Sequence, residues 1–161
     1  MTGILFAASE AQPLIKTGGL ADVAGSLPPA LRGQGEDIRL ILPAYADVLA
    51  HTADVEPRGE IRLGDERVGL LETRLPGGDV PVILVDHPWF SQRAGNPYMA
   101  PDGEPWKDNA QRFHLFSRTV AEVGMGRAGL EWRAAIVHCN DWQSGLAPAL
   151  LSLEPDRPAT V

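Results

Sequence analysis

The chain has 161 residues, the usual size of one domain, and a chain of this length can bury a hydrophobic core of its own. Its composition of 44% hydrophobic and 22% charged residues excludes a disordered or fibrous protein, and no apolar run approaches the roughly 18 residues needed to span a bilayer. The formal net charge of -7 disfavours a nucleic-acid partner, because an acidic surface repels polyanions.

The cysteine count and the first residues indicate a cellular compartment. Cys139 is the only cysteine, which excludes an intrachain disulfide and a multi-cysteine zinc site and fits a reducing environment. The opening residues, MTGILFAASEAQP, carry no basic leader, and Glu10 interrupts their apolar run before it reaches the length of a secretory core. We therefore expect a cytoplasmic protein with no membrane partner.

The first quarter of the chain predicts a strand, a loop, a helix and a second strand. Residues 3–9 (GILFAAS) form a short apolar run typical of a buried parallel strand. Apolar residues recur at helical spacing over residues 20–31, although Pro28 and Pro29 are expected to kink or restart that helix. Residues 37–42 (DIRLIL) predict the second strand, so this unit implies a right-handed crossover in a parallel sheet.

The middle of the chain predicts a hairpin, a strand and a long loop. Residues 60–75 contain two alternating stretches separated by Gly64 and Asp65, the pattern of a β-hairpin. Residues 80–86 (VPVILVD) predict another buried strand. The polar segment 91–105 is a loop of a length that is usually functional or mobile.

The last third predicts helix, strand, helix and the start of a strand. Residues 108–124 and 142–153 have helical periodicity, and residues 134–139 (AAIVHC) are typical of a strand between them. Residues 158–161 are typical of a strand that has just begun. Because a domain boundary normally falls in an exposed linker, we expect the chain to be a piece of a longer protein.

A glycine-rich motif near residue 124 does not indicate a dinucleotide site. Gly124, Gly126 and Gly129 match the G-x-G-x-x-G pattern, but that pattern needs a strand before it and a helix after it. Here a predicted helix precedes it. The motif is most simply a helix C-cap followed by a turn.

The segment K-T-G-G-L-A-D, residues 16–22, lies between the first strand and the first helix, where α/β sheets bind ligands. Gly18 and Gly19 allow bare backbone N–H groups to approach an anion, and Lys16 adds a full positive charge beside a helix start. These features suit a pyrophosphate, although the lysine precedes the glycines and so disfavours a Walker A loop. The alternative is a glycine turn beside a solvated lysine.

Three further side chains are expected at the same edge of the sheet. Asp22 either complements the dipole of the first helical turn or accepts hydrogen bonds from sugar hydroxyls. His138 and Asp141 end another strand, where Asp141 is either an N-cap or part of the ligand site. The adjoining His, Cys and Asp lack the spacing of metal ligands, so we expect no metal site.

Two strings carry a specific resemblance: K-T-G-G-L-A-D-V at residues 16–23 and H-x-x-D-W-x-x-G-L at residues 138–146. With these, the chain resembles the bacterial glycogen synthase and plant starch synthase family, retaining glucosyltransferases of the GT-B type. The resemblance covers essentially the whole chain. It is supported by the further segments S-E at 9–10, L-P-A-Y at 42–45, Asp86, G-N-P-Y at 95–98, D-N at 108–109 and R-F at 112–113.

The resemblance implies an α/β fold: a Rossmann-like parallel-sheet domain with a β-hairpin insertion, the N-terminal half of a two-domain GT-B enzyme, incomplete at its C-terminal end. Residues 1–161 would be part of a starch synthase type N-terminal catalytic domain. A second, nucleotide-binding domain would lie outside this chain.

The resemblance also implies roles for single residues. Lys16 would contact the phosphates of a nucleotide sugar, supported by the Gly18 and Gly19 amides. Asp22 and Tyr98 would lie on the glucose or acceptor side of the cleft, and Asp141 would orient the sugars. The candidate catalytic residues are Asp141, Asp22 and His138, and the candidate substrate-binding residues are Lys16, Gly18, Gly19 and Tyr98.

The implied reaction transfers glucose from ADP-glucose, or UDP-glucose in some members, to the non-reducing end of an α-1,4-glucan with retention of configuration. It needs no metal or cofactor. The sequence departs from the family at Asn140, where a histidine is common, and at residues 90–93, where Phe-Ser-Gln-Arg replaces a Tyr-Asp-Arg run. The alternatives are a non-catalytic sugar- or nucleotide-binding module and a GT-B glycosyltransferase with another donor or acceptor.

Overall fold

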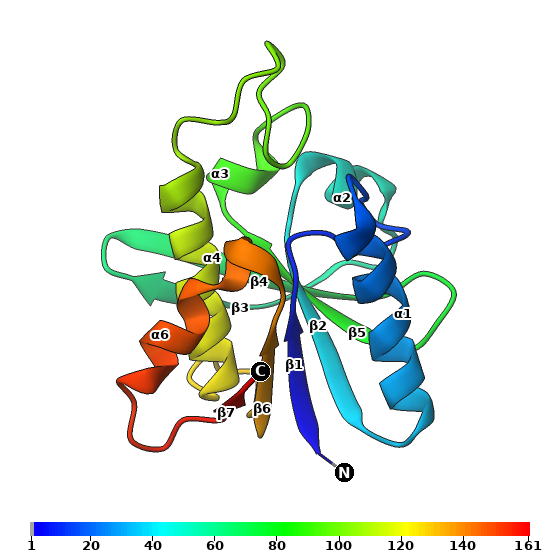
Figure 1. The fold of residues 1–161 in the computed structure, drawn as a ribbon, viewed down its shortest axis with the longest axis vertical. Helices are drawn as coiled ribbons and strands as arrows, with labels where there is room; N and C mark the ends of the chain where they lie inside the picture. Colours follow the sequence, from blue (N-terminus) through cyan, green and yellow to red (C-terminus); the bar gives the residue numbers. More distant parts are fainter. Residues whose placement is uncertain (1) are drawn as a thin grey trace.

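A computed structural model describes residues 2–161, which form a seven-stranded sheet in the order β3-β4-β5-β2-β1-β6-β7 (Figure 1). The ladders that join β5, β2, β1, β6 and β7 are all parallel, whereas β3 and β4 are added antiparallel at one edge. The strands are β1 (Gly3–Ala7), β2 (Asp37–Pro43), β3 (Glu56–Leu63), β4 (Glu66–Arg74), β5 (Pro81–Asp86), β6 (Ile136–Cys139) and β7 (Ala159–Thr160).

The central parallel strands are buried because helices cover both of their faces. Side chains of β1, β2 and β5 such as Leu5, Leu40 and Leu84 are fully buried, in agreement with their uninterrupted apolar sequences. All four apolar strands predicted from the sequence are confirmed. The short strand expected over residues 158–161 is also present, as β7 beside β6.

The predicted hairpin is confirmed as β3 and β4. Gly64, in the turn, has a φ of +69°, which favours glycine. Buried Ile61 and Leu63 alternate with exposed charged residues along β3, so one face of this strand packs on the core and the other meets solvent.

The helices are α1 (Gly19–Gly33), α2 (Ala46–His51), α3 (Pro88–Ser91), α4 (Asn109–Gly124), α5 (Asp141–Ser144) and α6 (Leu146–Ser152). In Figure 1, α1 lies on one side of strands β1 and β2, and α4 and α6 lie on the other. Among residues 2–161, none of these helices is long and apolar enough to cross a membrane.

Two helix predictions need correction. Pro28 and Pro29 do not restart α1, which is a single helix of 15 residues; burial of its apolar side, Pro28 included, offsets the missing N–H donors. The helix expected over 142–153 is divided into α5 and α6 at Gly145, a residue with low helix propensity. The sequence patterns predict neither α2 nor α3, which are only 6 and 4 residues long.

The motif at residues 124–129 is the expected helix end. Helix α4 stops at Gly124, and Gly126 and Gly129 follow with φ of +73° and +69°. A Cβ on Gly124 would lie 2.7 Å from Val137 Cγ2, so glycine here lets α4 approach β6 closely.

Candidate functional site

The carboxyl ends of β1 and β6 are neighbours in the sheet, which brings two chemistry-bearing segments together. Ala7 pairs with Cys139 at the ends of these parallel strands. The segment that follows β1 carries Lys16, and the segment that follows β6 carries Asp141. The loop after α3 rises above this same edge in Figure 1 and carries Tyr98.

Lys16 is held by an ion pair. Its Nζ lies 2.6 Å from Asp22 Oδ1 and 3.4 Å from Gln12 Oε1. The side chains of Lys16 and Asp22 are 49% and 53% exposed, so the pair remains open to solvent. Asp22 is therefore the immediate partner of Lys16, and both interpretations of this lysine, as an anion ligand and as a solvent-exposed loop charge, stay open.

The glycine turn ends where α1 begins. Gly18 is the N-cap of α1 and provides no side-chain cap, and Gly19 is the first helical residue. Backbone N–H groups of the first helical turn therefore lack an intrahelical acceptor. This leaves donors beside Lys16, as the sequence predicts for an anion site.

A buried carboxylate lies beneath this turn. Glu10 is 2% exposed, and its Oε2 accepts hydrogen bonds from Thr17 N at 2.6 Å and Thr17 Oγ1 at 2.5 Å. A Cβ placed on Gly18 would lie 3.7 Å from Glu10 Oε1, so the carboxylate also adjoins the glycines. Sequence reasoning did not assign this role to Glu10.

Tyr98 reaches the end of β1 from the long loop. Its hydroxyl lies 2.7 Å from Oγ of the fully buried Ser9. Mainly through burial, the pKa of Tyr98 is raised to about 12; the negative charges of Glu10 and Asp141 also raise it, whereas hydrogen bonds from Ser9 and Thr17 lower it. Tyr98 therefore lies within electrostatic reach of both carboxylates.

Asp141 begins α5 with a left-handed backbone. Its φ is +63°, an uncommon conformation for a residue with a side chain, and its Oδ1 accepts a hydrogen bond from Trp142 N at 2.7 Å. The N-cap is Asn140, so the N-cap interpretation of Asp141 is wrong. Asp141 is exposed, and within residues 2–161 the hydrogen bond that its carboxylate makes is to the adjacent Trp142.

The two neighbours of Asp141 in the motif are structural contacts to β1. The ring of His138 packs on Phe6 with centroids 4.7 Å apart, and partial burial lowers its pKa. Asn140 Nδ2 donates to Ala7 O at 3.0 Å. The amide that replaces the family's histidine therefore ties the segment after β6 to the end of β1.

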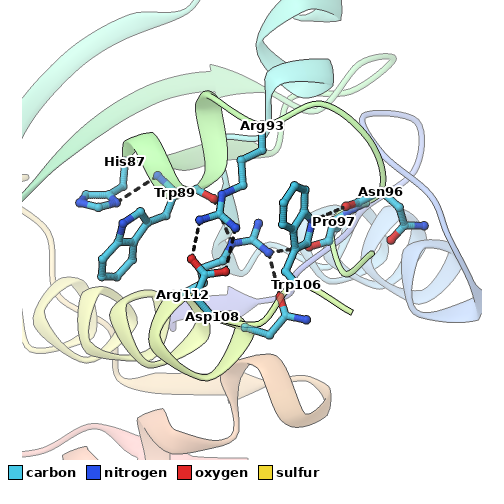
Figure 2. Close-up of polar contacts among 9 residues, drawn as sticks. His87, Trp89, Arg93, Asn96, Pro97, Trp106, Asp108 and Arg112 are labelled. Carbon is cyan, nitrogen blue, oxygen red and sulfur yellow. Dashed lines mark hydrogen bonds and ion pairs between the residues drawn. The ribbon is translucent and has the colours of Figure 1, made fainter. Parts of the chain in front are cut away.

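A buried arginine anchors the loop that carries Tyr98 (Figure 2). Arg112, on α4, is 1% exposed; its guanidinium donates to Trp89 O at 2.9 Å, Pro97 O at 3.0 Å and Asn109 Oδ1 at 2.9 Å. Burial lowers the pKa of Arg112. Because Pro97 precedes Tyr98, this arginine fixes the backbone from which the tyrosine extends.

A second arginine closes the same loop. Arg93 pairs with Asp108 through two hydrogen bonds, one of them 2.7 Å from Nη1 to Oδ1, and lies over the ring of Trp106 at 4.7 Å. The Arg93 guanidinium lowers the pKa of the Asp108 carboxyl. The segment 91–105 predicted as a long loop is therefore held at both ends (Figure 2).

The structure brings together most of the residues predicted for the site. Lys16 pairs with Asp22, Thr17 joins their turn to Glu10, and Glu10 and Asp141 both act on Tyr98. His138 lies at the same edge of the sheet but packs on the core. The side chains at this edge to which the sequence assigned no role are Glu10, Ser9 and Thr17, although all three lie in segments that carry the family resemblance.

The surface has hollows in three places, of which one, about 410 Å³, lies against the loop between Arg93 and Asp108. A second of about 500 Å³ is lined by Gln12, Asp22 and Ser26, beside the Lys16 turn. A third of about 540 Å³ lies beside the hairpin, where Arg58 is already paired with Glu56 and Glu72. We therefore place the candidate site at the carboxyl edge of the parallel strands, where the polar groups converge.

Several curated proteins similar to this chain are glycogen synthases. Glycogen synthase from Cellvibrio japonicus is 58% identical over 163 aligned positions, which cover 100% of this chain and 34% of that protein. Glycogen synthase from Thioalkalivibrio sulfidiphilus is 54% identical over 98% of this chain and 33% of that protein. The chain thus spans about a third of the length of these curated relatives.

A solved structure matches as well. The catalytic domain of starch synthase IV from Arabidopsis thaliana, bound to ADP and acarbose, superposes with a TM-score of 0.73 at 25% identity and covers 96% of this chain and 30% of that one. This match confirms the Rossmann-like fold of a GT-B starch synthase expected from the sequence. Residues 3–160 match the family described as the starch synthase catalytic domain, and the chain belongs to that family.

Proposed function

We propose that this chain forms one wall of the active site of a glycogen synthase that transfers glucose from a nucleotide sugar to the non-reducing end of an α-1,4-glucan with retention. The observation that carries the proposal is the match of residues 3–160 to the starch synthase catalytic domain, together with 58% identity to a glycogen synthase. The chain would be part of the N-terminal catalytic domain, and a second domain would supply the nucleoside pocket.

The Lys16 turn is the proposed diphosphate site. Glucosyl transfer requires stabilisation of a departing diphosphate, which fixed N–H donors and a compact cation provide. Lys16 lies beside the first N–H groups of α1 and pairs with Asp22 at 2.6 Å. On donor binding, the diphosphate would take the place of Asp22 as partner of Lys16, which frees the Asp22 carboxylate to accept hydrogen bonds from a sugar.

The Asp141 side of the site is the proposed glucose site. A carboxylate near the anomeric carbon stabilises the positive charge that develops on the sugar in an oxocarbenium-like transition state. Asp141 is exposed and near Tyr98, whose hydroxyl stays protonated at neutral pH because its pKa is about 12. Tyr98 can therefore donate as well as accept a hydrogen bond to a sugar hydroxyl.

The donor is proposed to be ADP-glucose, with UDP-glucose as the competing candidate. The structural relative from Arabidopsis thaliana is bound to ADP, which favours the adenine nucleotide. We infer that the protein works in the cytoplasm. The single cysteine, which fits a reducing compartment, supports this inference.

The test is glucosyl transfer by the protein in its full natural length. Purified protein is incubated with maltooligosaccharide and radiolabelled ADP-glucose or UDP-glucose, and chain extension and product anomer are measured. We expect extension with ADP-glucose in the α configuration. Absence of extension with both donors would contradict the proposal, and extension with UDP-glucose alone would change the donor.

The 161-residue chain by itself is the matched control. It is expected to show no measurable transfer, because the second domain must complete the nucleoside pocket and close the cleft. Robust extension by this chain alone would contradict the proposed division of the active site between two domains.

A further inference from the structure

The negative charge of Glu10 lies where it is unfavourable both for burial and for the binding of an anion nearby. It is 2% exposed and lies beneath the turn to which the proposed function assigns a diphosphate. A negative charge near a bound anion weakens binding by Coulomb repulsion, and more strongly in a desolvated place. A residue that only had to fill this space would be better as an uncharged one.

The contacts of Glu10 show what offsets this cost. One oxygen accepts both the backbone N–H and the hydroxyl of Thr17, at 2.6 and 2.5 Å. Hydrogen bonds to a carboxylate are roughly twice as strong as those between neutral groups. Thr17 lies between Lys16 and Gly18, so the two bonds fix the middle of the turn that carries the proposed diphosphate ligands.

Backbone hydrogen bonds between Ala11 and Ile15 hold the chain just before the turn, so the freedom that remains lies within the turn itself. The turn contains two adjacent glycines, which have the widest conformational freedom of all residues, and the Lys16 side chain is exposed. Gly18 does not cap α1 with a side chain, and the Lys16 to Asp22 contact is half-exposed. The Glu10 to Thr17 pair therefore joins the exposed middle of this turn to a buried carboxylate.

We propose that Glu10 is a positioning residue for the donor site: its carboxylate grips Thr17 and holds the turn of residues 16–19 in the conformation that receives a diphosphate. The residue acts through Thr17 and does not touch the substrate. The inference rests on the proposed function for the identity of the anion, a nucleoside diphosphate.

The sign of the effect of Glu10→Gln separates positioning from simple electrostatics. This change keeps the shape of the side chain and one acceptor oxygen but removes the charge and so weakens both bonds to Thr17. Positioning therefore predicts a donor KM about tenfold higher with little change in acceptor KM. If the charge mattered only as a repulsive neighbour, the same variant would bind the diphosphate more tightly. A lower donor KM in Glu10→Gln overturns the proposal.

Two variants of the partner residue complete the test in case the Glu10 variant folds poorly. Thr17→Val keeps the N–H bond to Glu10 and removes the hydroxyl, with its bond to Glu10 and its contact with Tyr98, and is expected to raise donor KM about three- to tenfold. Thr17→Ser retains both donors and is expected to have the smaller effect. Equal effects of the two variants contradict a role for the hydroxyl bond.

Glu36→Gln is the matched control, because the Glu36 carboxylate also accepts a backbone N–H, that of Thr2 at 2.8 Å, before the amino ends of β2 and β1. It is expected to leave donor KM unchanged. If Glu10→Gln lowers the melting temperature without changing donor KM, Glu10 is only a structural residue and the proposal fails.

A readout without substrate keeps this inference separate from the proposed function. Hydrogen–deuterium exchange of the segment 14–19 is measured on the same proteins, and the Thr17 amide is expected to exchange several-fold faster in Glu10→Gln than in wild type. Unchanged exchange overturns the positioning role even if transfer is confirmed. If the Thr17 amide exchanges faster in Glu10→Gln but the wild-type protein transfers no glucose from either nucleotide sugar, Glu10 still positions the turn and the proposed function is refuted.

Discussion

Charged side chains have different surroundings at the carboxyl edge of the parallel strands and in the antiparallel hairpin. At the carboxyl edge, Glu10 is buried, Asp141 has a left-handed backbone and Lys16 is paired beside a glycine turn. The hairpin keeps its charges on the solvent face in exposed pairs such as Arg67 with Glu60. The hairpin follows the local rules for stability, whereas the carboxyl edge departs from them, as expected where structure serves binding.

The largest expected effect tests whether Asp141 serves the sugar. In the full-length protein, Asp141→Asn should reduce kcat by roughly 10²- to 10³-fold, since a charge that stabilises the transition state is lost. Stability should hardly change, because asparagine also tolerates a positive φ and its Oδ1 can accept the Trp142 N–H. The measurements are kcat and thermal melting; wild-type turnover in a folded variant would leave Asp141 a purely structural role.

The next effect tests the Lys16 turn. Lys16→Ala should weaken donor binding or transfer by about ten- to a hundredfold, as expected for one charge-assisted contact. Its melting temperature should hardly move, because the pair with Asp22 is half-exposed and such pairs add little stability. Lys16→Arg should restore activity only in part, since a planar fork does not replace a compact charge. Unchanged kinetics in Lys16→Ala would show that the Lys16 turn at the carboxyl edge is not an anion site.

Much of the fold could be predicted from the sequence because buried strands leave a direct signature. Residues 3–9, 37–42, 80–86 and 134–139 are apolar runs, and each proved to contain a strand of the parallel part of the sheet. Short helices leave too few residues for a period to show, which is why α2 and α3 were missed. Pro28 predicted a break in α1, but the helix is continuous because its apolar side, which includes Pro28, is buried.

The site was predictable only in part, for a different reason. Lys16, Asp22 and Asp141 lie in motifs of small and charged residues that mark ends of strands. The partner of each side chain depends on tertiary structure: nothing in the sequence shows that Glu10 meets Thr17, or that Tyr98 crosses from a distant loop to Ser9. The sequence suggested Asp141 as an N-cap because aspartate often has that role between a strand and a helix. In the structure Asp141 has a left-handed φ and Asn140 is the N-cap.

A third prediction compares two tyrosines. Tyr98→Phe leaves the fully buried Ser9 hydroxyl without its partner and should lower the free energy of unfolding by about 1–3 kcal/mol. Tyr45→Phe is the matched control: the Tyr45 hydroxyl is buried and has no hydrogen-bond partner in the described residues, so its removal should be neutral or stabilising. Chemical denaturation measures both, and equal losses would contradict the special role of the Ser9 contact.

The same tyrosine predicts a pH dependence. Burial raises the pKa of Tyr98 from 10.0 to about 12, so between these values the folded state keeps a proton that the unfolded state has lost. The stability from this group is complete below the lower pKa and declines as pH rises toward the higher one. Denaturation across this range should show a shallower decline in Tyr98→Phe than in wild type. Tyr45 and Cys139, whose pKa values burial also raises, contribute to the decline that remains. An identical decline in both proteins would contradict the raised pKa.

The smallest effect is expected at the hairpin. Glu60 on β3 and Arg67 on β4 form a diagonal ion pair at 3.5 Å, with side chains 55% and 67% exposed. Solvent screens such a pair, so Glu60→Gln should change the free energy of unfolding by less than about 0.5 kcal/mol.

Glu10→Gln is the same chemical change at the carboxyl edge, on a carboxylate that is 2% exposed and accepts hydrogen bonds from two donors. Chemical denaturation of both variants at low and high salt separates the cases: the small effect at Glu60 should vanish in salt, whereas the effect at Glu10 should persist because water and ions do not reach it. A loss at Glu60 as large and as insensitive to salt as that at Glu10 would show that the two regions do not differ in how they use charge.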